Sequence, residues 1–216
     1  TDNPGEGIFN YRAKFIRTEA FRSHLAWLKK NFAIMPLAEL IEYHRLGTVP
    51  PRALAITFDD GYANNYEEAY PILHEAGMPA TFFITTDFAG RQAPLSVDII
   101  EYAIGMTKRT DISLDVGDAR QNFPLDNRAE RIRADLALRT IMKSLSGERA
   151  RILIEDIIRE CGADLRADIA ATPYRAMKWE DMRKMEMNGM TFAPHTKTHP
   201  ILSGISRQNA KEEITG

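Results

Sequence analysis

The chain has 216 residues, of which 44% are hydrophobic and 27% charged, and its formal net charge is −2. This length allows one domain with a substantial core or, as the less favoured alternative, two small ones, and the composition is that of an ordinary globular protein. The near-neutral charge, without basic runs interleaved with aromatics, excludes nucleic acid as the expected partner. The single cysteine, Cys161, excludes an internal disulfide. No apolar stretch reaches the ~18 residues that a membrane span needs.

The first part of the chain alternates between helix and strand patterns. Apolar residues at helical spacing predict a helix that starts at Thr18, as its N-cap, and runs to about Phe32, and another at about Leu37–Leu46. The apolar run Ala53–Phe58 predicts a strand buried on both faces. A helix at about Asn65–Ala76 and a second buried strand at Pro79–Thr85 follow. The order strand, helix, strand predicts a parallel sheet.

The stretch at about 95–175 has a different character, because it is charge-rich and mostly helical in pattern. Helices are expected at Arg128–Leu145 and Glu148–Cys161, with a short strand at Asp111–Val116. We interpret this stretch as an insertion that packs beside or over the sheet.

The strand-and-helix pattern then returns. It predicts a helix at about Trp179–Asn188, a strand at Met190–Ala193 and a last helix after Ser206. The expected organisation is one α/β domain over residues 1–216, interrupted by the helical insertion.

Two carboxylates follow the first predicted strand, in the sequence Asp59-Asp60-Gly61. Active sites of parallel α/β proteins lie at the carboxyl ends of the strands. The same three residues are also ordinary turn chemistry. Adjacent carboxylates repel each other, however, and a cation or a proton would offset that repulsion if they were partly buried.

Two histidines, His195 and His199, follow the strand at Met190–Ala193. Their spacing of four residues would place them on one face of a helix, but Pro200 disfavours helical backbone at His199. Position 196 is a threonine, whereas the H-E-x-x-H proteases have their glutamate base there. The pair is therefore predicted to lie on a strand-to-loop edge, and a base must come from elsewhere.

Two imidazoles and one carboxylate suit zinc or another first-row divalent ion, with positions left for water and substrate. Such an ion lowers the pKa of bound water from 15.7 toward ~7 and polarises a carbonyl oxygen. The other aspartate can then take the proton of the water. On an extended chain Asp59 and Asp60 project in opposite directions, so one can bind the ion while the other lies beside the water.

Other residue types that could bear chemistry are predicted to be structural. His24, His44 and His74 lie within helical patterns, and the methionines have the spacing of a packed helix and strand. This set of methionines comprises Met177, Met182, Met185, Met187 and Met190. Cys161 is expected to be a small buried apolar residue. Tyr62, Asn64 and Asn65 either line a pocket or simply begin a helix.

The two motifs together resemble a known family. Thr57-Phe58-Asp59-Asp60-Gly61-Tyr62 resembles the first motif of the polysaccharide deacetylases, which form the NodB-homology domain of carbohydrate esterase family four, and His195-Thr196-Lys197-Thr198-His199-Pro200 resembles the second. The resemblance implies a distorted (β/α) barrel and hydrolysis of acetyl groups on a polysaccharide, with N-acetyl groups favoured over O-acetyl groups. By resemblance the base is Asp59, the metal ligands are Asp60, His195 and His199, and the supporting residues are Thr196, Gly61 and Tyr62.

The resemblance also implies a cofactor, partners and a location. It implies Zn²⁺ as the metal, an acetylated polysaccharide or oligosaccharide as the partner, and an exported or envelope-associated bacterial protein. The stretch at about 95–175 is similar to an insertion of exopolysaccharide-type members. Family members continue with an oxyanion-holding segment and a histidine that acts as general acid, and neither follows His199 in this sequence. The chain is therefore interpreted as the N-terminal part of an incomplete barrel, whose open edge would favour self-association.

Three alternatives remain open from the residues. The same motifs fit a hydrolase of small, non-peptide amides on the same fold. An iron oxygenase with two histidines and one carboxylate is another, although such sites usually place one histidine and the carboxylate two residues apart on one strand. The third is a carbohydrate-binding fragment without catalytic competence.

Overall fold

The computed structural model describes residues 7–117, 119–145, 147–163 and 172–215. These residues form two compact units. The first unit comprises Ile16–Ala93 and Arg175–His199, and the second comprises 7–15, Pro94–Tyr174 and 200–215. Both predicted motifs lie in the first unit, with only Pro200 outside it. The organisation as one domain with an insertion at about 95–175 stays a prediction, and residues 118, 146 and 164–171 of that insertion lie outside the described residues.

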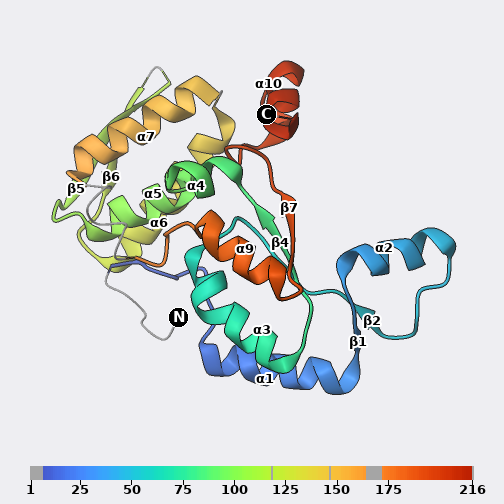
Figure 1. Ribbon diagram of the computed structural model, residues 1–216. Coiled ribbons are helices and arrows are strands. Elements are labelled where there is room, and N and C mark those ends of the chain that lie inside the picture. Colours follow the sequence, from blue (N-terminus) through green and yellow to red (C-terminus); the bar gives the residue numbers. More distant parts are fainter. Residues whose placement is uncertain (1–6, 118, 146, 164–171, 216) are drawn as a thin grey trace. The chain divides into compact units, whose positions relative to one another are not determined.

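Short parallel strands form the centre of the first unit (Figure 1). They are β1 (Ala33–Ile34), β2 (Ala53–Leu54), β3 (Thr57–Phe58), β4 (Thr81–Ile84) and β7 (Thr191–Pro194). β1 pairs with β2, and β4 lies between β3 and β7, with every pair parallel. The prediction of a parallel sheet is therefore confirmed. Within the described chain these strands do not close into a barrel.

The prediction of one strand at Ala53–Phe58, buried on both faces, is wrong. The segment forms two short strands because it changes its hydrogen-bonding neighbour midway. Met35 in the β1 segment donates to the carbonyl of Leu54, whereas Thr81 of β4 donates to the carbonyl of Ile56. None of the six residues is fully buried.

Helices cover one face of this sheet (Figure 1). The helices of the unit are α1 (Thr18–Asn31), α2 (Leu37–Leu46), the π-helical turn η1 (Asn65–Ala69), α3 (Tyr70–Ala76), α4 (Thr86–Arg91) and α9 (Trp179–Met187). Thr18 was expected as the N-cap of the first helix, but Arg17 holds that position. The hydroxyl of Thr18 instead donates to the carboxylate of Glu68, at 3.1 Å. The predicted helix at Asn65–Ala76 is present, with its first five residues in π-helical form.

A ladder of stacked phenylalanines forms the covered face of the sheet. The ring of Phe82 lies 4.7 Å from that of Phe58 and 5.6 Å from that of Phe192. Four of the five methionines predicted to be structural are buried in the same core, namely Met177, Met182, Met185 and Met190. The prediction is wrong for Met187, which is 78% exposed because it ends α9 on the side away from Met182.

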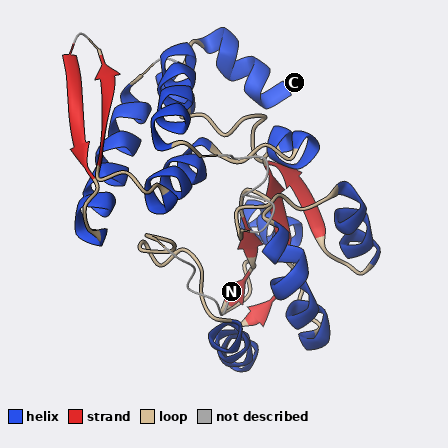
Figure 2. Ribbon diagram, turned by 90° about the vertical axis from the view of Figure 1, so that its left-hand side faces the viewer, coloured by secondary structure: helices blue, strands red, loops and turns tan. Residues whose placement is uncertain are grey.

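The second unit is mainly helical, as the sequence predicts. Its elements are α5 (Ser96–Met106), β5 (Asp111–Val116), β6 (Ala119–Pro124), α6 (Arg128–Ser144), α7 (Gly147–Cys161), the 3₁₀ turn η3 (Leu202–Gly204) and α10 (Arg207–Thr215). β5 pairs with β6 as an antiparallel hairpin, visible as the two long arrows of Figure 2. The polar sequence of β6 did not predict a strand, and only Phe123 in it is buried. None of the described helices is long and apolar enough to cross a membrane.

Cys161 is buried in the core of the second unit, as expected, and burial raises the pKa of its thiol to about 12. The thiol therefore stays protonated at neutral pH, which is its weakly nucleophilic form.

A network of charged and phenolic side chains also lies inside the second unit, which the sequence did not predict. Arg139 of α6 donates to Asp135 at 2.6 Å and to Glu101 of α5 at 2.8 Å. The hydroxyl of Tyr174 donates to Glu101 at 2.8 Å, and that of Tyr11 donates to Asp135. Burial and the neighbouring carboxylates raise the pKa of both phenols, so both stay protonated in the folded chain. Arg139 therefore supplies positive charge to two buried carboxylates.

Replacing Arg139 by methionine should lower the free energy of unfolding by about 3–5 kcal/mol, because it removes the guanidinium that is hydrogen-bonded to two buried carboxylates. Urea unfolding of the whole chain measures this change. Arg133→Met is the matched control, since Arg133 lies on the same helix with an exposed side chain paired to Glu130, and its loss should cost less than ~1 kcal/mol. Equal costs for the two variants would contradict the structural role given to the network.

Candidate metal centre

The three residues predicted as metal ligands come together at the carboxyl ends of β3 and β7. Asp60 Oδ1 lies 3.3 Å from His199 Nε2 and 3.7 Å from His195 Nε2. The three ligand atoms all lie within 4.8 Å of one another. Ligands bound at ~2.1 Å around one tetrahedral ion are themselves about 3.4 Å apart. The spacing and the donor types therefore fit a zinc-like ion.

The site is open to solvent on one side. The exposed side-chain fractions are 21% for Asp60, 35% for His195 and 38% for His199. Asp60 Oδ1 itself is buried beneath the two imidazoles. All three side chains are thus in contact with solvent.

The first motif forms a tight turn centred on Asp60. The N–H of Gly61 donates to the carbonyl of Asp59 at 2.9 Å, and the φ of Asp60 is 71°, which is the rare, strained form of the three-residue γ-turn. Asp59 precedes the turn, and its side chain is exposed. Its role as the base stays a prediction.

Gly61, predicted as a supporting residue, has little space for a side chain. Its φ is 92°, and a Cβ atom there would lie 3.0 Å from Cδ1 of Ile84. The close approach lets the turn pack directly against β4. Tyr62, the next supporting residue, is half-buried, and its ring meets that of Phe88 edge-on at 5.2 Å.

Residues 175–177 are hydrogen-bonded to this turn. The N–H of Met177 donates to the carbonyl of Gly61, and the N–H of Ala63 donates to the carbonyl of Arg175, each at 2.8 Å. The guanidinium of Arg175 also makes a double hydrogen bond with Glu67 in η1. No sequence signal pointed to these contacts, since they join segments more than a hundred residues apart.

The second motif forms a loop and not a helix, in agreement with the prediction from Pro200 and Thr196. Thr196 and His199 both have positive φ, at 63° and 60°. The N–H of His199 donates to the hydroxyl of Thr196 at 3.1 Å. The N–H groups of Thr86 and Asp87, at the start of α4, donate to the carbonyls of Thr196 and Lys197. These bonds fix the loop that carries both histidines.

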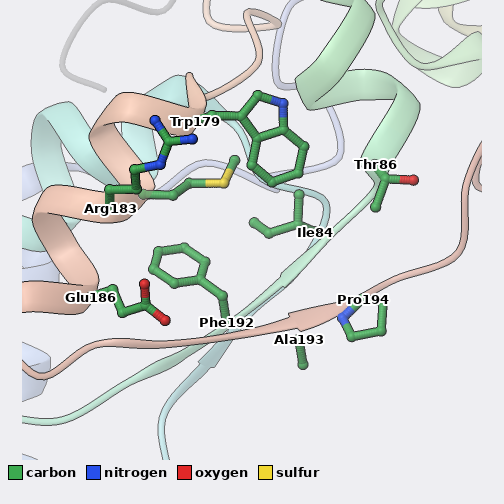
Figure 3. A pocket seen from close by; sticks show the side chains of 9 residues that line it. Ile84, Thr86, Trp179, Arg183, Glu186, Phe192, Ala193 and Pro194 are labelled. Atoms are coloured by element: carbon green, nitrogen blue, oxygen red, sulfur yellow. The ribbon is translucent and has the colours of Figure 1, made fainter.

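A pocket of about 270 Å³ lies between helix α9 and strand β7 (Figure 3). Trp179, Arg183 and Glu186 line it from α9, and Phe192 and Pro194 line it from β7. Successive residues of a strand point to opposite faces. Phe192 stacks on Phe82 on the helix-covered face, while His195 meets Phe83 on the opposite face. Asp60, His195 and His199 are not among the residues that line this pocket.

The other histidines do not join the site. His24 and His44 are exposed on α1 and α2, and His74 lies in the last turn of α3 with its ring 5.7 Å from that of Tyr70. Among the described residues, Asp60, His195 and His199 form the one group of three or more metal-ligating side chains.

The Gly61→Ala substitution should lower the free energy of unfolding by about 2–3 kcal/mol, because a Cβ atom is strained at φ 92° and crowds Ile84. Thermal or urea unfolding measures the loss. Gly77→Ala is the matched control: Gly77 also has positive φ, but nothing lies within 4 Å of the added atom, so its cost should be about 1 kcal/mol. If Gly77→Ala cost as much as Gly61→Ala, the contact with Ile84 would be irrelevant.

Comparison with known proteins gives a family. A family model described as polysaccharide deacetylase matches residues 46–216. A poly-β-1,6-N-acetyl-D-glucosamine N-deacetylase of Staphylococcus aureus is 40% identical over 81 residues, which are 37% of this chain and 28% of that protein. The protein of the same name from Escherichia coli is 39% identical over 69 residues, which are 31% of this chain and 10% of that protein. The matched regions thus cover less than a third of these curated relatives.

A solved structure also shares the fold. The Streptococcus pyogenes deacetylase PplD in complex with acetate aligns with 95% of this chain and 57% of its own length, with a TM-score of 0.52 and 15% identity. At this identity the likeness shows the fold alone, and it confirms the predicted α/β fold of the NodB type. Because the family model spans most of the sequence, including both motifs, this chain belongs to the polysaccharide deacetylase family.

Proposed function

We propose that this chain carries the metal-binding part of a deacetylase that hydrolyses N-acetyl groups on a poly-β-1,6-N-acetylglucosamine-like polysaccharide. The observation that carries the proposal is the convergence of Asp60, His195 and His199 beside a second carboxylate, Asp59. The relatives named above support N-acetylglucosamine polymers as the substrate class.

Asp60 Oδ1 and the Nε2 atoms of His195 and His199 would hold a divalent cation, for which we propose Zn²⁺ because imidazole and carboxylate ligands with an open side suit it. When bound, such an ion lowers the pKa of a water molecule toward ~7 and polarises the acetyl carbonyl. The buried position of Asp60 Oδ1 between two imidazoles orients the carboxylate toward this place.

Asp59 would act on the water. Its carboxylate accepts a proton as the water oxygen attacks the acetyl carbon, and the carbon–nitrogen bond then breaks to give acetate and an amine. The nitrogen needs a proton in order to leave, and the one that Asp59 has accepted is available for it. The two carboxylates would have different roles, since only Asp60 lies at ion-pair distance from the imidazoles.

Location and assembly follow as parts of the same proposal. A polymer of this class is a surface material, so we infer an exported or envelope-associated protein. Strand β7 has only β4 as a neighbour among the described strands, and an unpaired strand edge favours self-association. The second unit would then be an insertion within one catalytic domain.

The Asp59→Asn substitution should reduce acetate release from an acetylated β-1,6-glucosamine oligomer by about 10²–10⁴-fold while Zn²⁺ affinity stays near that of the wild type. Asp60→Ala should lose acetate release and at least tenfold in Zn²⁺ affinity, because it removes a ligand. Acetate is measured enzymatically, and Zn²⁺ affinity by competition with a chromophoric chelator. His24→Ala, at an exposed helical position, is the control that changes neither.

The same assay separates the alternatives. Hydrolysis of small amides without acetate release from the oligomer would overturn the polysaccharide substrate. Binding of the oligomer by wild type and Asp60→Ala alike, with no acetate released by either, would indicate a carbohydrate-binding fragment. An iron- and oxygen-dependent reaction would overturn hydrolysis itself.

A further inference from the structure

Thr85 occupies the position between the two motifs. It follows directly after β4, and β4 lies between β3, which leads into Asp60, and β7, which leads into His195. The side chain is completely buried, with an exposed fraction of 0%. A buried hydroxyl needs a hydrogen-bond partner, so the identity of that partner shows what the residue does.

The backbone and the side chain of Thr85 are each hydrogen-bonded to the backbone of a candidate ligand residue. Its backbone N–H donates to the carbonyl of Asp60 at 3.1 Å, and its side-chain hydroxyl donates to the carbonyl of His195 at 3.3 Å. The residue before it, Ile84, accepts a hydrogen bond from the N–H of His195 at 2.8 Å. Two consecutive residues, the last of β4 and the one after it, thus hold the backbone of the candidate carboxylate ligand and of one candidate imidazole ligand.

The hydroxyl is available for this role because it does not cap the helix that Thr85 precedes. A threonine at an N-cap usually accepts a hydrogen bond from the first turn. At α4 the side chain of Thr85 makes no such bond, and the N–H groups of Thr86 and Asp87 donate instead to carbonyls of the histidine loop. The loop itself caps the helix, and the hydroxyl of Thr85 donates to His195.

We propose that Thr85 is a positioning residue that fixes the distance between Asp60 and His195 and so prepares the metal centre before the metal binds. The inference rests on the proposed function, because it assumes that these two residues are ligands. Groups that orient metal ligands usually change metal affinity by 10–100-fold when they are removed.

The test compares metal binding by variants of the whole chain, with Co²⁺ as the probe. Thr85→Val keeps the shape and the backbone bond to Asp60 but removes the hydroxyl, so Co²⁺ affinity should fall at least tenfold and the visible absorption of bound Co²⁺ should shift. Thr85→Ser keeps the hydroxyl and should stay within about threefold of the wild type. If Thr85→Val does not fold, Thr85→Ala against Thr85→Ser gives the same comparison without added bulk.

A matched control lies at the other end of the same strand. Thr81 is also buried, and its hydroxyl meets that of Thr191 at 2.6 Å, away from the ligands. Thr81→Val therefore makes the same chemical change and should leave Co²⁺ affinity and absorption as in the wild type.

The outcomes distinguish the two proposals. A wild-type chain that binds no Co²⁺ would overturn the metal centre and the role of Thr85 with it. A wild type that binds Co²⁺, together with Thr85→Val or Thr85→Ala of equal affinity and spectrum, would overturn only the role of Thr85. An affinity loss in Thr81→Val as large as that in Thr85→Val would assign the effect to strand stability and overturn it too.

Discussion

The hydrogen bonds that β4 makes to its two neighbours are the constraint on which the candidate centre depends. Asp60 and His195 lie far apart in the sequence, and each is held to the end of β4 by backbone bonds from residues 84 and 85. Parallel strands end at one edge of a sheet, so pairing alone brings the two loops together. Any change that shifted the register of β4 would therefore separate the carboxylate from the imidazoles.

The ends of these strands then bend sharply to aim the side chains. Asp60, Thr196 and His199 all have positive φ, a conformation that costs about 1–3 kcal/mol for a residue other than glycine. The cost is high for threonine, because its Cβ atom is branched. Hydrogen bonds to neighbouring segments offset the strain: Met177 holds Gly61, and Thr86 holds Thr196. Hydrogen bonds to neighbouring segments thus hold the loops that carry Asp60, His195 and His199.

The sequence predicted those features of this arrangement that depend on local patterns of apolar residues. Helical spacing located α2 correctly, and the strand patterns placed Asp60 and His195 at the ends of parallel strands. Pro200 and Thr196 were enough to show that the histidines lie on a loop. The pattern at Ala53–Phe58 could not show the change of partner, because that depends on where β1 and β4 lie. Thr85 looked like the end of an apolar strand, since its role is set by contacts with distant residues.

The burial of charged side chains in the second unit was not predicted from the sequence. Glu101, Asp135 and Arg139 belong to a charge-rich stretch, and all three are buried. They can be buried because α5 and α6 place them within hydrogen-bonding distance of one another and of Tyr174. A pattern of charges along one helix cannot reveal a partner on another helix.

Ion pairs in the two units show how burial sets the loss of stability when a charged side chain is removed. In the first, the pair of Arg175 and Glu67 is largely exposed, so water and salt screen it and its loss should be mild. In the second, Asp98, Glu101 and Asp135 are within 1% of full burial, so any unpaired charge stays in a poorly solvating interior. The stability lost with a charged side chain therefore depends on its burial and not on the number of ion pairs that it makes. Exposed pairs such as that of Arg151 and Glu148 accordingly add little to stability.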